Sequence, residues 1–367
     1  MFLFMLKELQ YVITNKPHLK LKKSSSMLTA TDLTGTPVKK VKAKPKRKTI
    51  DLISTIGVEF TFVKSVFDAT SMSELVQRFQ NATGFDERVI HTDSDACEVT
   101  SPIFTTYDQL NHFYLWINEV AESLGLHGII WVTENDITDR LPTGGGHINL
   151  GYPKLTTKDS VSERLHYLKN LTYILNFNPY ITWIFNEPQD NDSAKHLGGY
   201  LKADGQISNL RTFIQSFKTE TLSDFSSSSY ITTRQTNPIT CYNPTAVAEL
   251  SLPNVFERTF REQRRAIEFR NFNAYEDEQD LFICVDFVNQ LALKCNDPNF
   301  CAYNFVDVTD HIQEQSERLA KIKSDVQFCI SEFNDLCNLI DVDPTVYHNK
   351  IVDNLEHRFE LGDSFTV

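Results

Sequence analysis

Four ionisable residues lie in short segments that otherwise have the composition of apolar β-strands. Glu59 lies in IGVEFTF, His147 in GGGHINLG, and Glu268 with Arg270 in AIEFRNF. A charge buried in a sheet without a partner is costly, so something must compensate each of them. Because residues i and i+2 of a strand share a face, Asn149 is expected beside His147. Two carboxylates and an imidazole can hold a divalent metal ion if the three strands adjoin.

Each segment also has a simpler interpretation when it is taken alone. Glu268 and Arg270 can pair with each other, His147 can be a hydrogen-bonded core residue, and the glycines before it can form an ordinary loop. Only the combination of the three segments favours a site.

The order of these motifs resembles the glutamine synthetase and glutamate-cysteine ligase superfamily. Its signature runs from an early GxExE strand through a strand with Glu near Ser-Pro, a glycine-rich GxHxH or GxHxN strand, and a late ExR strand. The corresponding segments, between residues 50 and 275, are GVEFT, DACEVTSP, GGGHIN and IEFR. The EVTSP and GGGHINLG segments are most similar to the amidoligase branch, in particular to carboxylate-amine ligases encoded by bacteriophages.

The resemblance implies an α+β fold with a curved antiparallel sheet packed by helices and a helical C-terminal segment. It also implies an ATP-dependent reaction, in which a carboxylate attacks the γ-phosphate and an amine then displaces phosphate from the acyl phosphate. The implied cofactors are ATP and Mg²⁺ or Mn²⁺. The implied substrates are a carboxylate and an amine, such as an amino acid, a peptide or a polyamine.

The resemblance assigns roles to individual positions. Glu59, His147 and Glu268 would hold the metal ion between nucleotide and transferred phosphoryl, and Glu98 would bind a substrate-side metal ion. Arg270 would contact phosphate oxygens, because its planar fork suits bidentate contact. Further candidates for nucleotide or substrate contact are Asn149, Arg234, Arg264 and Arg265, although each arginine can equally be surface charge and at most one of the last two should point into the site.

The sequence departs from the family pattern at Thr61, where GxExE would place its second carboxylate. The substrate-side metal ion would keep Glu98 but lose one oxygen donor. Either that site is weaker, catalysis uses fewer metal ions, or another acid substitutes, the candidates being Asp93, Asp95 and Glu187. Glu187 has two other interpretations, as a base for the incoming amine or as part of a solvated loop.

Two other functions remain open. One is phosphoryl transfer to a guanidino or similar nitrogen, although the presence of both His147 and Asn149 favours the ligase. The other is a catalytically inactive binding or virion-associated protein that keeps the fold, which Thr61 favours.

Charge divides the chain into a basic arm and an acidic body. Residues 1–48 contain 12 Lys or Arg and 2 Asp or Glu, whereas the remaining residues contain 24 and 46. We predict a poorly ordered arm at 1–48, a catalytic domain at 49–300 and a helical extension at 301–367 packed on the core. The arm is interpreted as a solvated linker or as a tail that contacts nucleic acid or an acidic protein.

The seven cysteines have irregular spacing, which predicts reduced, buried thiols and a cytoplasmic protein, in the host cytoplasm if the source is viral. The apolar start MFLFML is too short for a membrane span, so no membrane contact is expected. Members of the superfamily often assemble into rings, so an oligomer is also open.

Periodicity predicts the elements that must position these residues. The expected helices are 71–80 with a serine N-cap, 107–124 with Gly125 at its end, 159–185 interrupted by Pro179, 276–293, and one long helix at 310–339. The expected strands begin at 49, 97 and 265, and 128–135 is expected to pair with 146–152.

Overall fold

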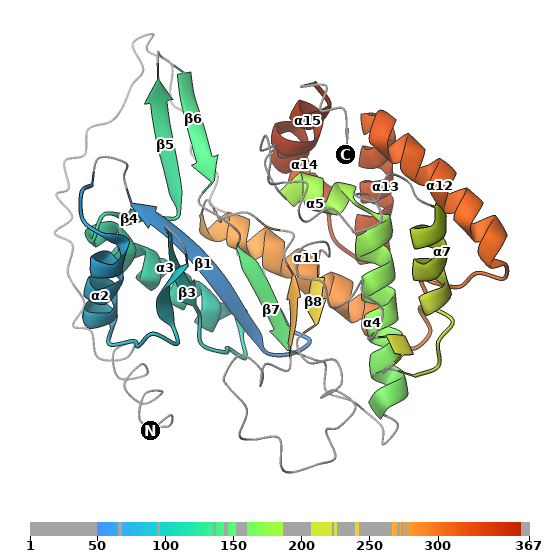
Figure 1. Ribbon diagram of the computed structural model, residues 1–367, viewed down its shortest axis with the longest axis horizontal. Coiled ribbons are helices and arrows are strands. Elements are labelled where there is room, and N and C mark those ends of the chain that lie inside the picture. The colour runs from blue at the N-terminus through green and yellow to red at the C-terminus, as the bar shows by residue number, and fades with distance from the viewer. Residues whose placement is uncertain are drawn as a thin grey trace, which may run out of the picture. The chain divides into compact units, whose positions relative to one another are not determined.

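In the computed structural model, helices are combined with antiparallel strands, so the predicted α+β class is confirmed (Figure 1). Residues Thr49–Val367 form one compact unit. The structure describes residues 50–64, 68–93, 96–134, 137–142, 146–151, 160–185, 207–221, 224–225, 239–241, 266–269, 272, 275 and 277–360. The basic arm lies outside these residues, and the domain boundary near residue 300 stays a prediction.

The larger of the two described sheets has seven strands, and every pair in it is antiparallel. The nine-residue strand β1 (Ile56–Lys64) is central, with a neighbour along each edge. The strand order is β2 (Ile90–Asp93), β3 (Ala96–Thr100), β1, β7 (His147–Gly151), β9 (Ala266–Phe269) and β8 (Ile239–Cys241), with β4 (Leu126–His127) paired to the end of β1.

One face of this sheet is apolar and packs on helices. Val58, Phe60 and Phe62 alternate along β1 and are at most 4% exposed. The Phe62 ring contacts Phe79 of α2 (Met72–Thr83), and the Phe60 ring contacts Tyr114 of α3 (Tyr107–Ser123) at 5.5 Å between centroids. Side chains of the intervening β1 residues therefore belong to the opposite face.

The remaining helices pack largely on one another (Figure 1). Helix α11 contacts both α3 and α4 and thereby joins them to the sheet region, while α12 contacts α7 and α13. These helices are α4 (Ser160–Phe177), α5 (Tyr180–Phe185), α7 (Ile207–Ser216), α11 (Glu278–Asn296), α12 (Val308–Ser324) and α13 (Val326–Leu339), followed by the short turns η3 (Pro344–Tyr347), α14 (His348–Lys350), η4 (Ile351–Glu356) and α15 (His357–Glu360).

Helix boundaries follow the predicted signals in several places. The Ser71 hydroxyl accepts a hydrogen bond from the Glu74 amide at the start of α2. Gly125 has a left-handed φ of 76° directly after α3, a conformation that glycine adopts at little cost. The chain also breaks between α4 and α5 at Pro179, as predicted.

The long helix predicted for 310–339 is wrong, because the chain forms α12 and α13 there. Asp325 leaves the helical conformation, with φ −138° and ψ 99°, and its side chain accepts a hydrogen bond from the Phe328 amide. The apolar spacing from Ile322 to Val326 continues across the break, so periodicity alone does not reveal this N-cap.

The predicted pairing of 128–135 with 146–152 is also wrong. Strand β5 (Ile129–Glu134) pairs with β6 (Ile137–Pro142) in a separate two-stranded sheet, and β7 pairs with β1 and β9. The segment ITDRLP has three polar residues in succession between Ile137 and Leu141, so it lacks the period-2 alternation that would predict a strand.

The cysteine prediction needs one correction. Cys97, Cys284, Cys295, Cys329 and Cys337 are free and buried, whereas Cys301 is free and exposed. Burial raises the pKa of the Cys97 thiol to about 12, so that thiol stays protonated at neutral pH. No helix in the described part of the chain has the length and apolar character needed to cross a membrane.

Candidate functional site

The polar face of the sheet carries Glu59 at its centre. Glu59 is in register with His147 on β7 and with Thr100 on β3, and only 6% of Glu59 is exposed. The His147 Nδ1 atom lies 3.4 Å from Glu59 Oε2, and the Asn149 side-chain amide donates a hydrogen bond of 3.3 Å to Oε1. The strand alternation thus brings together three of the residues that the sequence singled out.

This cluster is a buried carboxylate in contact with an imidazole and an amide. Such a group is stabilised further by a cation, because neutral donors offset only part of the cost of burying a charge. The Oδ1 atom of Asn149 is buried and has no hydrogen-bond donor within reach among the described residues. That oxygen therefore has the capacity to accept one more contact.

Glu268 lies in the neighbouring cross-strand row, on the same face of the sheet. Its backbone on β9 is in register with Asn149, which in turn opposes Gly57 of β1. The Glu268 side chain lies outside the described residues, so its approach to Glu59 stays a prediction. Among the residues that the structure describes, no three His, Cys, Asp or Glu side chains are arranged to hold a metal ion.

The donor chemistry nevertheless fits a hard divalent cation. Glu59 offers carboxylate oxygens, Asn149 a buried amide oxygen and His147 an imidazole, all on one face of adjacent strands. Mg²⁺ prefers oxygen donors, and Mn²⁺ also accepts imidazole nitrogen.

A second carboxylate lies on the same face, two strands from β7. Glu98 of β3 is in register with Thr61 on one side and with His91 of β2 on the other. The His91 Nε2 atom is 3.1 Å from Glu98 Oε1, and their side chains are 22% and 16% exposed. Glu98 therefore has an imidazole partner, as Glu59 does.

His91 is the residue that the sequence interpretation missed. The segment IHTD precedes DACEV by one residue, and its alternation of His91 with Asp93 is the pattern of a strand in a hairpin. Asp93 pairs with Ala96 at the far end of that hairpin, but its side chain lies outside the described residues.

Several predicted residues fall outside the part of the chain that the structure describes. These residues are Asp95, Glu187, Arg234, Arg264, Arg265 and Arg270. Their roles stay predictions.

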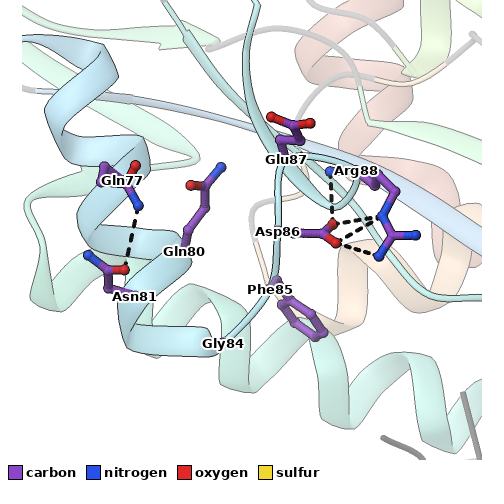
Figure 2. Close-up of a pocket in the computed structure, with 8 residues that line it drawn as sticks. All are labelled: Gln77, Gln80, Asn81, Gly84, Phe85, Asp86, Glu87 and Arg88. Atoms are coloured by element: carbon purple, nitrogen blue, oxygen red, sulfur yellow. Dashed lines mark hydrogen bonds and ion pairs between the residues drawn. The ribbon is translucent and has the colours of Figure 1, made fainter. Parts of the chain in front are cut away.

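A surface pocket of about 500 Å³ lies elsewhere, between the second half of α2 and the loop leading to β2 (Figure 2). Asp86 and Arg88 face each other there as an ion pair, and the Arg88 hydrogen bond lowers the pKa of the Asp86 carboxyl. Neither Glu59 nor Glu98 lines this pocket. Asp86 and Arg88 neutralise each other, and none of the sheet residues singled out above lines the pocket, so we do not place the chemistry there.

No family model matches the sequence, and no curated protein matches it. The structure is similar to a solved structure described as a novel glutamine synthase homolog, with 13% identity and a TM-score of 0.37, over 84% of this chain and 67% of that one.

Proposed function

We propose that this protein is an ATP-dependent carboxylate-amine ligase that forms an amide or peptide-like bond through an acyl phosphate. The observation that carries the proposal is the cluster in which Glu59 contacts His147 and Asn149, with Glu268 of β9 in register with Asn149. The sequence motifs that contribute this cluster occur in the same order as in the superfamily that the sequence resembles.

The reaction requires positive charge at the site. A carboxylate substrate and the γ-phosphate of ATP are both anionic, so they approach only where positive charge offsets their repulsion. A bound Mg²⁺ or Mn²⁺ supplies that charge and polarises the phosphoryl oxygens. Glu59, His147 and Glu268 would hold it, and Arg270 would contact the phosphate oxygens.

The two chemical steps balance without a further reactant. A substrate carboxylate oxygen bonds to the γ-phosphorus as the bond to the β–γ bridging oxygen breaks, which releases ADP. The amine nitrogen then bonds to the acyl carbon, inorganic phosphate leaves, and the amine proton passes to a base. Glu187 is a candidate for that base, as is solvent.

The direct test follows nucleotide and phosphate separately. The protein is incubated with ATP, Mg²⁺ and mixtures of carboxylates with amino acids or polyamines, and ADP and free phosphate are measured. Phosphate release that depends on the amine supports the ligase. A phosphorylated product without free phosphate identifies a phosphotransferase, which is the alternative within the superfamily.

A variant pair ties the activity to the site. We expect Glu268→Gln to abolish turnover while the thermal unfolding transition is retained, because the change removes a charge but little volume. Glu119→Gln is the matched control, since Glu119 is an exposed carboxylate of α3. Absence of nucleotide binding by the wild-type protein would favour the inactive, binding or virion-associated alternative that Thr61 suggests.

A further inference from the structure

Strand β7 begins at His147, directly after a glycine triplet that ends at Gly146. Glycine has few conformational preferences, so the triplet does not fix the position of His147 by itself. The described pairs between β7 and β9 start at Ile148, one residue after His147. The contacts of Gly146 therefore determine how the chain enters the strand.

Both backbone hydrogen-bonding groups of Gly146 are bonded to the segment that follows β9. The Gly146 amide donates a hydrogen bond of 3.0 Å to the Phe272 carbonyl. The Tyr275 hydroxyl donates one of 2.9 Å to the Gly146 carbonyl. That carbonyl belongs to the planar peptide unit whose nitrogen is the His147 amide. The bond from Tyr275 therefore fixes the direction of the backbone where β7 begins.

Tyr275 is itself held on the apolar side of the sheet. It is 6% exposed, and its ring meets Phe60 of β1 edge-on at 6.0 Å between centroids. The Tyr114 hydroxyl of α3 donates a hydrogen bond of 3.2 Å to the Tyr275 carbonyl. Asp277, two residues later, is the N-cap of α11. Contacts with β1 and α3 and the start of α11 thus fix the position of Tyr275.

The Tyr275 hydroxyl is a permanent donor. Burial raises the pKa of Tyr275 well above its ordinary value of 10, so the phenol keeps its proton at neutral pH. Gly146 is buried as well, and a buried carbonyl that loses its donor is costly. We therefore expect the backbone at Gly146 to shift when this hydroxyl is removed.

We propose that Tyr275 positions His147 for the ligase reaction by holding the Gly146 carbonyl. The inference rests on the proposed function, in which His147 and Glu59 take part in holding the metal ion. His147 Nδ1 lies 3.4 Å from Glu59 Oε2, so a small change in where β7 begins would alter this donor geometry. Tyr275 acts through the backbone and from the apolar side, so it is a positioning residue.

The test compares Tyr275→Phe with the wild-type protein by two measurements. Hydrogen–deuterium exchange, resolved to single amides by electron-transfer fragmentation, follows the Gly146 amide. Steady-state kinetics use ATP, Mg²⁺ and the amine that supports phosphate release. We expect faster exchange at Gly146 while the amides bonded within the β7 ladder stay protected. We also expect kcat to fall about 10- to 100-fold with an unchanged KM for the amine.

Two other buried tyrosines provide matched variants. Tyr347→Phe removes a hydroxyl that donates to the Ile283 carbonyl of α11 at 3.4 Å. It should lower the thermal unfolding temperature but change neither exchange at Gly146 nor kcat. Tyr114→Phe keeps the Tyr275 hydroxyl and removes the support of its backbone. It should accelerate exchange at Gly146 less than Tyr275→Phe does.

The outcomes separate this inference from the proposed function. Unchanged exchange at Gly146 in Tyr275→Phe would overturn the inference, as would a kcat within about twofold of the wild-type value. If Tyr275→Phe does not fold, equal exchange at Gly146 in Tyr114→Phe and Tyr347→Phe would overturn it. If the wild-type protein shows no amine-dependent phosphate release, the proposed function is overturned. Faster exchange at Gly146 in Tyr275→Phe would still support Tyr275 as the residue that positions His147.

Discussion

The two carboxylate–imidazole pairs of the polar face differ in depth. Glu59 and His147 join the central strands β1 and β7, with side chains 8% and 16% exposed, and Asn149 adds a second contact to the carboxylate. Glu98 and His91 join β3 to the outer strand β2 and are 16% and 22% exposed. The more buried carboxylate, Glu59, costs more free energy to desolvate, so it depends more on a nearby cation or hydrogen-bond donor. We therefore expect a cation held at Glu59 to be integral to the site and a cation held at Glu98 to exchange readily.

The largest expected effect concerns the central carboxylate. Glu59→Gln should lower ATP turnover about 10²- to 10³-fold, because it removes the negative charge that would bind the cation while keeping the side-chain shape. Turnover is measured at saturating ATP and Mn²⁺, and thermal unfolding checks the fold. A folded variant that keeps more than a tenth of wild-type turnover would contradict the assignment of Glu59.

A carboxylate added beside each pair shows whether the more deeply buried pair loses more unfolding free energy. Asn149→Asp places a second carboxylate next to Glu59, where the amide now donates at 3.3 Å. Without a cation the like charges should cost about 2 kcal/mol of unfolding free energy, and Mn²⁺ should restore the loss. Denaturant unfolding in a chelator and in Mn²⁺ measures both values.

Thr61→Asp is the matched variant at the outer pair. Thr61 is in register with Glu98 but is less buried than Asn149, so the added charge should cost less in the chelator. Equal losses for the two variants would mean that the difference in depth has no energetic consequence.

The outer carboxylate should behave differently from the central one when it is neutralised. Glu98→Gln is expected to weaken the binding of a Mn²⁺ ion at the substrate-side position about tenfold and to leave an ion at Glu59 unchanged, because Glu98 is not among the side chains proposed to hold the latter. Turnover should fall at low Mn²⁺ and recover as Mn²⁺ is raised. A loss that excess Mn²⁺ cannot reverse would place Glu98 in the chemistry itself rather than in binding of an exchangeable ion.

The sequence predicts the central pair better than the outer one for a physical reason. Glu59 and His147 are charged or polar residues inside strongly apolar strands, so they stand out against their neighbours. His91 lies in a four-residue strand with mixed composition, where a histidine looks like an ordinary loop residue. Only the register shows that it faces Glu98.

The errors in the fold have the same origin. The long strand β1 and the capped helices α2 and α3 carry strong local signals, whereas the pairing of β7 depends on distant segments of the chain. Strand β6 is short and polar, so local patterns pair β5 with the wrong neighbour. Long-range pairing is not encoded in any local window of residues.

A third carboxylate–imidazole pair, in the helical region, provides the smallest expected effect. His311 Nδ1 lies 3.5 Å from Glu314 Oε2 on α12, and the Tyr173 hydroxyl lies 2.8 Å from His311 Nε2. The ring also stacks on Phe305 at 4.4 Å between centroids. Neither partner belongs to the sheet, so we expect no cation there, and His311→Gln should leave Mn²⁺ binding unchanged.

What His311→Gln should change is the dependence of stability on pH. Burial lowers the pKa of His311 from its ordinary value of 6.5, against an opposing effect of Glu314. The unfolded chain therefore takes up a proton on His311 at a higher pH than the folded chain does. The stability that neutral His311 contributes is fully present above pH 6.5 and is lost as the pH falls through the pKa of His311 in the folded state. Urea unfolding at pH 7.5 and pH 5 should show a smaller difference for His311→Gln than for the wild-type protein. An unchanged difference would mean that the acid sensitivity arises elsewhere.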